Sequence, residues 1–338
     1  MKYSFFLFAI LVMNLTLHAQ DQPEELGKVQ WLRDYDQAAD RAAAEGKCVL
    51  ILFQEVPGCS TCRYYGNGAL SHPLVVEAIE SLFVPLCIYN NKGGEDGKVL
   101  KRYQEPAWNN PVVRIVAPDG KDVVNRVSGN YSALGLVEAM TEALGNRGAQ
   151  MPAYLGLLKE ELEAKQSGTS TATLSMYCFW TGEKQLGQLS GVVSTQPGFM
   201  EGHEVVKVEY NPAIIPLESL VQAGKEARCA DKVYVNGVEQ QADAGKVVGA
   251  QSVRSEANFR PDDTPKYYLA QTPYRYVPMT ALQATRANAL VGKGQSPDAI
   301  LSPRQLALVT RIKASPKAGW KDAIGVDLDK AWGRITGF

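Results

Sequence analysis

The sequence predicts two successive α/β units followed by a segment that is mostly helical, an α/β (α+β) class overall. Helical and strand-like patterns alternate from Val29 to Leu144, and a second alternation begins near Thr171. A helix ending in a small-polar linker, over 150–170, separates the two. At 338 residues, the chain is long enough for two domains that each bury their own core.

The first unit opens with a predicted helix over 31–47, for which Gly46 is a plausible stop. Cys48–Gln54 is a continuous apolar run of strand length, which indicates a strand buried on both faces. A CSTC segment follows at once. An amphipathic helix over 71–83 and a strand over 84–90 come next.

The remainder of this unit contains two further strands and a closing helix. After a glycine-rich loop, 109–129 predicts two strands joined at Pro118-Asp119-Gly120. The pattern over 132–144 predicts a helix. The order of helix, strand, CxxC, helix, strand, proline, strand, strand and helix is that of a thioredoxin-like domain.

Cys59 and Cys62 lie at the predicted strand-to-helix turn. A helix N-terminus presents free N–H groups and partial positive charge, which favour a thiolate at Cys59 and leave Cys62 to resolve a mixed disulfide. A static disulfide and a metal site are the alternatives, but zinc needs further ligands and none is evident nearby in the sequence. The pattern favours a redox couple and indicates no metal and no cofactor.

Residues 29–145 resemble thioredoxin-like proteins, and Asn110-Pro111 resembles their cis-proline loop. The resemblance implies that Pro111 lies beside the reactive cysteine and contacts substrate; an ordinary proline at a strand start is the alternative. VPGCSTC, over 56–62, resembles the VPGUxxT family of thioredoxin-like (seleno)proteins. This second resemblance implies that Cys59 is the attacking atom.

The second unit has strand character over 173–180 and 204–212, and helical character over 183–189 and 216–224. Residues 171–225 resemble peptide methionine sulfoxide reductase A. The residues that carry the resemblance are Cys178-Phe179-Trp180, Glu183, the GVVST segment over 191–195, Gly198-Phe199 and the HEVVKVEYNP segment over 203–212.

That resemblance implies that Cys178 is the nucleophile that attacks the sulfoxide sulfur. Phe179 and Trp180 would form the methyl pocket, and Glu204 would be the acid. The sequence departs from the family at Tyr177 and Thr181, where the family has glycines, and a segment that supplies a tyrosine is deleted. A buried Cys178 in a binding module is therefore the alternative.

Two further residues complete the candidate site. Cys229 would resolve the sulfenic acid through a Cys178–Cys229 disulfide, or would be an unreactive surface thiol. Tyr274 is the candidate for a second family tyrosine. The alternative to a substrate-binding role for this tail is that its helices only pack onto the second domain. One of these helices is predicted to start at Ser302-Pro303.

Residues 1–19 have a positive start, a short apolar core and a small residue before a polar stretch, which predicts a cleaved signal peptide. We therefore expect a periplasmic or secreted protein with no stable membrane span. The net charge of −1 and the absence of a basic stripe indicate no nucleic-acid partner. Six cysteines are too few for a disulfide-stapled scaffold of this length.

These observations predict an exported thiol-disulfide oxidoreductase in which a thioredoxin-like domain over 20–149 is fused to a sulfoxide reductase-like domain over 171–249. A C-terminal extension over 250–338 follows. Its partners would be oxidised proteins or peptides and a thiol electron donor that the sequence does not identify. The alternative is a protein disulfide oxidoreductase whose second domain only binds polypeptide.

Overall fold

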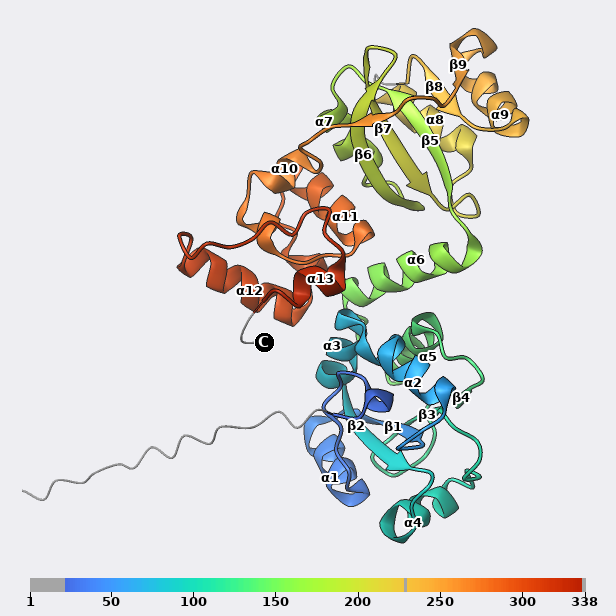
Figure 1. Ribbon diagram of the computed structural model, residues 1–338, viewed down its shortest axis with the longest axis vertical. Coiled ribbons are helices and arrows are strands. Elements are labelled where there is room, and N and C mark those ends of the chain that lie inside the picture. The colour runs from blue at the N-terminus through green and yellow to red at the C-terminus, as the bar shows by residue number, and fades with distance from the viewer. Residues whose placement is uncertain (1–21, 228–229, 336–338) are drawn as a thin grey trace, which may run out of the picture.

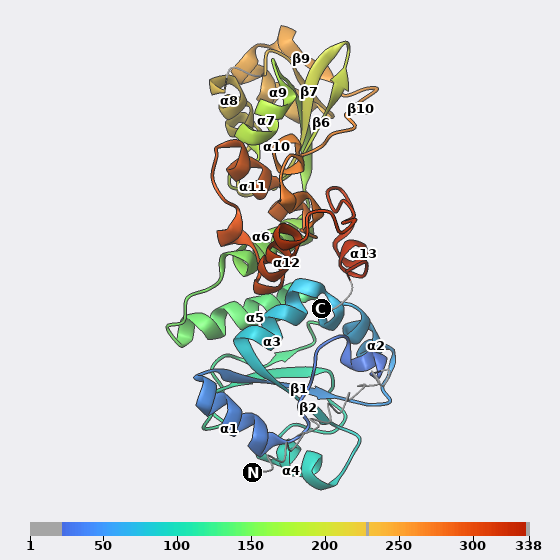
Figure 2. The same cartoon turned by 90° about the vertical axis from the view of Figure 1, so that its left-hand side faces the viewer.

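The computed structural model describes residues 22–227 and 230–335. Three parts follow one another along the long axis of the molecule (Figure 1). An α/β domain of residues 22–149 lies at one end, a second α/β unit lies at the other, and a helical unit lies between them, as the view at right angles also shows (Figure 2). Among the described residues, no helix combines the length and the apolarity that crossing a bilayer requires.

The first domain is built on a four-stranded sheet in the order β2-β1-β3-β4. Its strands are β1 (Cys48–Gln54), β2 (Phe83–Tyr89), β3 (Val112–Val116) and β4 (Val127–Ser128). The first two are parallel, and β3 pairs antiparallel with both β1 and β4. All seven residues of β1 are buried, because helices cover both faces of the sheet.

Alternation along β1 divides the core of this domain into two layers. Leu50 and Leu52 pack with residues of α3 and α5, whereas Ile51 and Phe53 pack with residues of α1 and α4. The helices are α1 (Tyr35–Glu45), α2 (Ser60–Asn67), α3 (Pro73–Leu82), α4 (Gly94–Arg102) and α5 (Ala133–Asn146), with short 3₁₀ turns η1 (Glu24–Leu26) and η2 (Ala69–Ser71).

Two details differ from the expectations for this domain. The first helix begins only at Tyr35, where Asp34 caps it, and Leu32 instead forms a bridge with Leu86 of β2. The glycine-rich loop contains the helix α4, which places Glu95 and Asp96 in its first turn, where they complement the helix dipole. Gly46 ends α1 in the left-handed conformation, as predicted.

The second α/β unit contains a six-stranded sheet in the order β10-β6-β7-β5-β8-β9. Its strands are β5 (Ser170–Ser175), β6 (Val192–Met200), β7 (His203–Tyr210), β8 (Val233–Val235), β9 (Val253–Ser255) and β10 (Arg260–Pro261). Its helices are α7 (Phe179–Leu186), α8 (Leu217–Glu226) and α9 (Val238–Val248), followed by the 3₁₀ turn η3 (Ala250–Ser252). The three helices share one apolar cluster with the sheet, and β9 and β10 extend the sheet past residue 249.

The helical unit combines the segment before the second sheet with the end of the chain. Its elements are α6 (Ala153–Ser167), α10 (Tyr267–Ala270), η4 (Pro273–Tyr276), α11 (Ala281–Gly292), η5 (Asp298–Ile300), α12 (Pro303–Ala314) and α13 (Leu328–Trp332). As predicted, α12 starts with Pro303 at its first position, and Ser302 and Gln305 form a capping box.

One buried carboxylate joins the helical unit to the first domain, and a second holds two helices of the helical unit together. Glu77 of α3 accepts hydrogen bonds from Ser302 Oγ and from the Arg304 N–H, both at 2.6 Å. Burial raises the pKa of Glu77, and these two donors oppose that rise. The Glu161 carboxylate of α6 caps α11 by accepting from the Leu282 N–H at 3.0 Å. The first domain is therefore docked at the N-terminus of α12.

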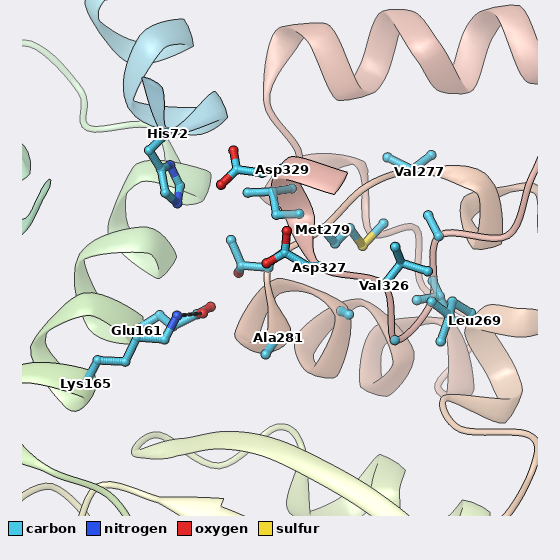
Figure 3. Close-up of a pocket in the computed structure, with 16 residues that line it drawn as sticks. His72, Glu161, Lys165, Leu269, Val277, Met279, Ala281, Val326, Asp327 and Asp329 are labelled. Atoms are coloured by element: carbon cyan, nitrogen blue, oxygen red, sulfur yellow. Dashed lines mark hydrogen bonds and ion pairs between the residues drawn. The ribbon is translucent and has the colours of Figure 1, made fainter. Parts of the chain in front are cut away.

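A cavity of about 470 Å³ lies where the first domain, α6 and the C-terminal helices meet (Figure 3). His72 enters it from the start of α3, Glu161 and Lys165 from α6, and Asp329 from α13. Burial lowers the pKa of His72, whose Nδ1 has no hydrogen-bond partner. Burial at this junction therefore favours the neutral imidazole, and the charges of Asp329 and Glu161 oppose that effect.

Candidate active site

Cys59 and Cys62 occupy the turn between β1 and α2, as the sequence predicts. Cys59 is the N-cap residue of α2 and is exposed, whereas Cys62 is fully buried one turn into the helix. Their sulfur atoms are 3.5 Å apart and both thiols are free. A disulfide between them would require an approach of about 1.5 Å, to the usual S–S length of about 2.0 Å.

The surroundings separate the acidities of the two thiols. The backbone N–H of Cys62 is the largest cause that lowers the pKa of Cys59 below its ordinary value of 9.0. Burial raises the pKa of Cys62 to about 11, and its hydrogen bond with Cys59 adds to that rise. At neutral pH the exposed sulfur is therefore the better nucleophile, and the buried one stays protonated.

The loop before β3 closes the other side of this turn. The Asn110-Pro111 peptide bond is cis, and the Cys62 thiol donates to Asn110 Oδ1 at 3.0 Å. Asn90, next to the end of β2, holds this loop by donating to the Asn109 carbonyl at 3.1 Å. Trp108, in the same loop, is 82% exposed. The same loop therefore carries the exposed Trp108, the hydrogen-bond partner Asn110 and the cis-proline Pro111.

Hydrogen bonds of the buried residues Gln54 and Glu25 hold the backbone of the CxxC turn in place. Gln54, at the end of β1, donates to the carbonyls of Glu25 and Cys62 at 2.7 and 3.3 Å. The Glu25 carboxylate accepts from the Gly58 N–H at 2.8 Å. A Cβ at Gly58 would lie 2.3 Å from the Glu55 carbonyl oxygen and 2.7 Å from Cys62 Cβ. Only glycine fits at this position without moving the turn.

Sequence reasoning missed Glu55. One oxygen of its carboxylate and the two sulfurs of Cys59 and Cys62 all lie within 4.8 Å of one another. Histidine and cysteine spacing, the usual sequence pattern of zinc sites, does not include a glutamate that precedes the turn. The sequence feature that could have indicated Glu55 is a carboxylate four residues before the first cysteine.

The second candidate site is built on the turn between β5 and α7. Cys178 is the N-cap residue of α7 and is half-buried. The Glu204 carboxylate accepts from the Phe179 N–H at 2.9 Å, so it lies at the N-terminus of the same helix. Tyr177, which stands where the resembled family has a glycine, is 94% exposed. The structure therefore brings Cys178 and Glu204 to one end of α7.

Aromatic rings surround the residues that follow Cys178. Phe179 is buried and meets Phe199 edge to face, with centroids 5.4 Å apart. Trp180 stacks on Tyr267, with centroids 3.8 Å apart and planes 11° from parallel. One face of the Trp180 ring is thus covered by a residue that the sequence did not suggest.

A buried ion pair positions Tyr267. Its neighbour Lys266 donates from Nζ to the Glu183 carboxylate at 2.9 Å, and Glu183 also accepts from the Lys266 N–H at 2.9 Å. Thr195 completes the network, because its hydroxyl donates to Glu183 at 3.0 Å. Glu183, part of the resemblance over 171–225, therefore ties α7 to the start of α10.

The remaining predicted site residues have different outcomes. Tyr274 lies in the core of the helical unit, where its hydroxyl donates to Asp298 at 2.7 Å, and its substrate-binding role stays a prediction. Cys229 and the segment 1–19 lie outside the described residues. Ala230, which is described, donates its N–H to the Ser175 carbonyl at 2.7 Å.

The two cysteine sites belong to opposite ends of the molecule. Cys59 starts α2 in the first domain, and Cys178 starts α7 in the second unit, with the helical unit between these units (Figures 1 and 2). In this arrangement the first site does not reach the second.

Fold and site together define the first domain as a thioredoxin-like domain with a CxxC centre. In agreement, a family model described as thioredoxin-like matches residues 30–118. A thioredoxin from Thermus thermophilus is among the similar solved structures, with 22% identity, 36% of this chain and 90% of that chain covered, and a TM-score of 0.31.

The curated relatives that match this chain are peptide methionine sulfoxide reductases. One from Methanococcus maripaludis is 33% identical over 73 residues, covering 17% of this chain and 46% of the relative. The mitochondrial enzyme of Mus musculus is 29% identical over 141 residues, covering 35% and 58%. One from Vibrio cholerae is 28% identical over 149 residues, covering 32% and 69%. The chain thus combines a thioredoxin-like domain with similarity to this reductase, and it spans about half the length of the first two relatives.

Proposed function

We propose that this protein is an exported thiol oxidoreductase that reduces oxidised proteins or peptides through Cys59 and Cys62. The observation that carries the proposal is the pair itself: an exposed thiol with a lowered pKa lies 3.5 Å from a buried thiol with a raised one. The VPGCSTC segment supports the assignment of Cys59 as the attacking atom. The pattern over 1–19 supports export, and a periplasmic or secreted location is part of the proposal.

The reaction at the first site follows from this asymmetry. The Cys59 thiolate attacks one sulfur of a substrate disulfide, a Cys59–substrate bond forms, and the other substrate sulfur leaves as a thiolate. Cys62 then loses its proton and attacks the Cys59 sulfur. The Cys59–Cys62 disulfide forms, and the substrate departs with both electrons as a dithiol. A separate thiol donor, outside this chain, must return the pair to its reduced form.

The second unit would act on methionine sulfoxide, which is the substrate class in the printed names of the relatives. In this proposal the Cys178 thiolate attacks the sulfoxide sulfur and forms a transient bond to it, while Glu204 delivers a proton to the sulfoxide oxygen. The oxygen leaves the methionine sulfur as hydroxide, and hydroxide then bonds to the Cys178 sulfur as the bond between the two sulfurs breaks. The products are methionine and a Cys178 sulfenic acid. Cys229 would condense with that sulfenic acid, releasing water and leaving a disulfide.

Electrons would pass from the first site to the second between two chains, or after the first domain undocks from α12. This follows from the helical unit that lies between the two cysteines in Figure 1. Fusion still raises the local concentration of reductant when undocking is possible.

One observation favours the second candidate function, a disulfide oxidoreductase whose second unit binds polypeptide without catalysis. Trp180, the expected wall of a methyl pocket, is stacked on Tyr267, and Phe179 is buried against Phe199. In this arrangement Tyr267 occupies one face of the Trp180 ring that a methyl group would otherwise contact.

The test measures consumption of a methionine sulfoxide peptide by the purified full chain in the presence of a thiol reductant. Turnover that disappears in Cys178→Ser supports the sulfoxide reductase function. Equal rates for the unsubstituted protein and Cys178→Ser would instead favour the binding module. Reduction of a protein disulfide, measured in parallel, tests the first site independently, and no reduction by the unsubstituted protein would refute its proposed role.

A further inference from the structure

The CxxC turn contains a third metal-ligating group that the redox reaction does not require. Among residues 22–227 and 230–335, Glu55, Cys59 and Cys62 form the one group of three such residues whose ligand atoms lie within 4.8 Å of one another. The group comes from eight consecutive positions, 55–62, between the end of β1 and the first turn of α2, so the backbone that fixes the CxxC also fixes the carboxylate.

The spacing of the two sulfurs suits a tetrahedral ion. Zinc–sulfur bonds of about 2.3 Å at a tetrahedral angle put two thiolates about 3.8 Å apart. The observed separation between the Cys59 and Cys62 sulfurs is 3.5 Å, so only a few tenths of an ångström of adjustment are needed. Cys59 is exposed, which leaves a path for the ion to enter and a fourth position for water.

The Glu55 carboxylate is uncommitted. Within the described part of the chain, it forms no ion pair and no side-chain hydrogen bond. The nearby guanidinium of Arg63 instead donates to the Gly58 carbonyl at 2.7 Å and pairs with Glu24 at 3.3 Å. Two thiolates and this carboxylate together carry enough negative charge to neutralise a divalent ion. Arg63, the cation of the turn, has other partners and forms no ion pair with Glu55.

We propose that, in the reduced protein, Cys59, Cys62 and Glu55 bind a thiophilic divalent cation, with Zn²⁺ as the reference ion. Thiolate ligands select Zn²⁺ and similar soft ions over Mg²⁺ and Ca²⁺. Binding displaces the proton of each thiol that is protonated and transfers no electrons. The oxidised pair cannot bind in this way, because its two sulfurs are bonded to each other.

Occupancy would regulate the first site. A Cys59 sulfur coordinated to the ion is not free to attack a disulfide, so the ion would inhibit exchange reversibly and shield the dithiol from oxidation. The inhibition rests on the proposed function, whereas binding requires only the reduced thiols.

The experiment titrates Zn²⁺ into the reduced full chain against a chromophoric chelator, and Co²⁺ into a parallel sample for its thiolate charge-transfer absorption. We expect one ion per chain, with a Co²⁺ spectrum of thiolate ligation, and no such binding by Cys62→Ser or by the oxidised protein. Glu55→Gln should bind at least ~10-fold more weakly, since even loss of an outer-shell partner weakens metal sites by about 10- to 100-fold. Glu24→Gln, an acid of the same region that pairs with Arg63, is the matched control and should bind as the unsubstituted protein does.

Equal affinity of the unsubstituted protein and Glu55→Gln would overturn the inference, as would a Co²⁺ spectrum that persists in Cys62→Ser. Disulfide reduction in the presence of a chelator separates this inference from the proposed function. Active exchange without metal binding refutes only the metal site. Metal binding without exchange refutes the redox role and leaves the site in place.

Discussion

The difference in acidity between Cys59 and Cys62 predicts which thiol reacts first with an alkylating reagent. The hydrogen bond from the Cys62 backbone lowers the pKa of Cys59 below its ordinary value, whereas burial raises that of Cys62 to about 11. At mildly acidic to neutral pH, each difference of two pKa units corresponds to about 100-fold more thiolate on the more acidic thiol. A thiolate of lower pKa is intrinsically less nucleophilic by about 6- to 10-fold over two units, which leaves a net advantage of ~10-fold or more.

Burial increases this advantage, because Cys62 is fully buried while Cys59 is exposed. As the pH rises, labelling should begin at Cys59, and Cys62 should follow only as the pH approaches 11. The assay is brief iodoacetamide treatment of the reduced protein at a series of pH values, quenched and read peptide by peptide by mass spectrometry. Cys48 and Cys87, both buried in the first domain, are internal references that should stay unlabelled while the protein is folded. Equal labelling of Cys59 and Cys62 near neutral pH would refute the assignment of their roles.

Two substitutions test the structure around the sites, with denaturant unfolding as the measurement. Gly58→Ala should lower the free energy of unfolding by about 1–3 kcal/mol, because the new Cβ collides with the turn. Gly93→Ala, where a Cβ meets nothing within 4 Å, is its control, and equal effects of the two would contradict this account of the turn. Lys266→Met should cost about 3–5 kcal/mol by leaving the buried Glu183 unpaired. Lys98→Met, which removes an exposed ion pair, should cost less than about 1 kcal/mol, and a comparable loss would argue against the buried pair.

The sequence predicted best what depends on neighbouring residues. The apolar run over 48–54 became β1 with its predicted limits, and Gly46 and Pro303 mark a helix end and a helix start where expected. The glycines at 93 and 94 suggested a loop, but Gly93 is the N-cap of α4, whose first turn is acidic. Local composition did not distinguish a glycine-rich loop from a glycine that starts a helix.

At the sites, the cysteines were found because the strand-to-helix turn is encoded locally. Tyr267 was missed, because its stacking on Trp180 depends on how α10 and α7, which are far apart in the sequence, both pack against α11. Tyr274 was chosen by sequence similarity, and its ring instead fills the helical core. Which tyrosine meets a given ring is decided by tertiary packing and the Lys266–Glu183 ion pair, neither of which has a periodic signature in the sequence.

The most direct test of the central claim, that Cys59 attacks and Cys62 resolves, is to trap mixed disulfides with single-cysteine substitutions. Reduced Cys62→Ser, mixed with a disulfide-containing protein, should accumulate a covalent adduct through Cys59 that is visible by non-reducing electrophoresis, because the resolving thiol is absent. Cys59→Ser should form none, since its remaining thiol is buried and protonated. Adducts on Cys59→Ser, and none on Cys62→Ser, would contradict the account.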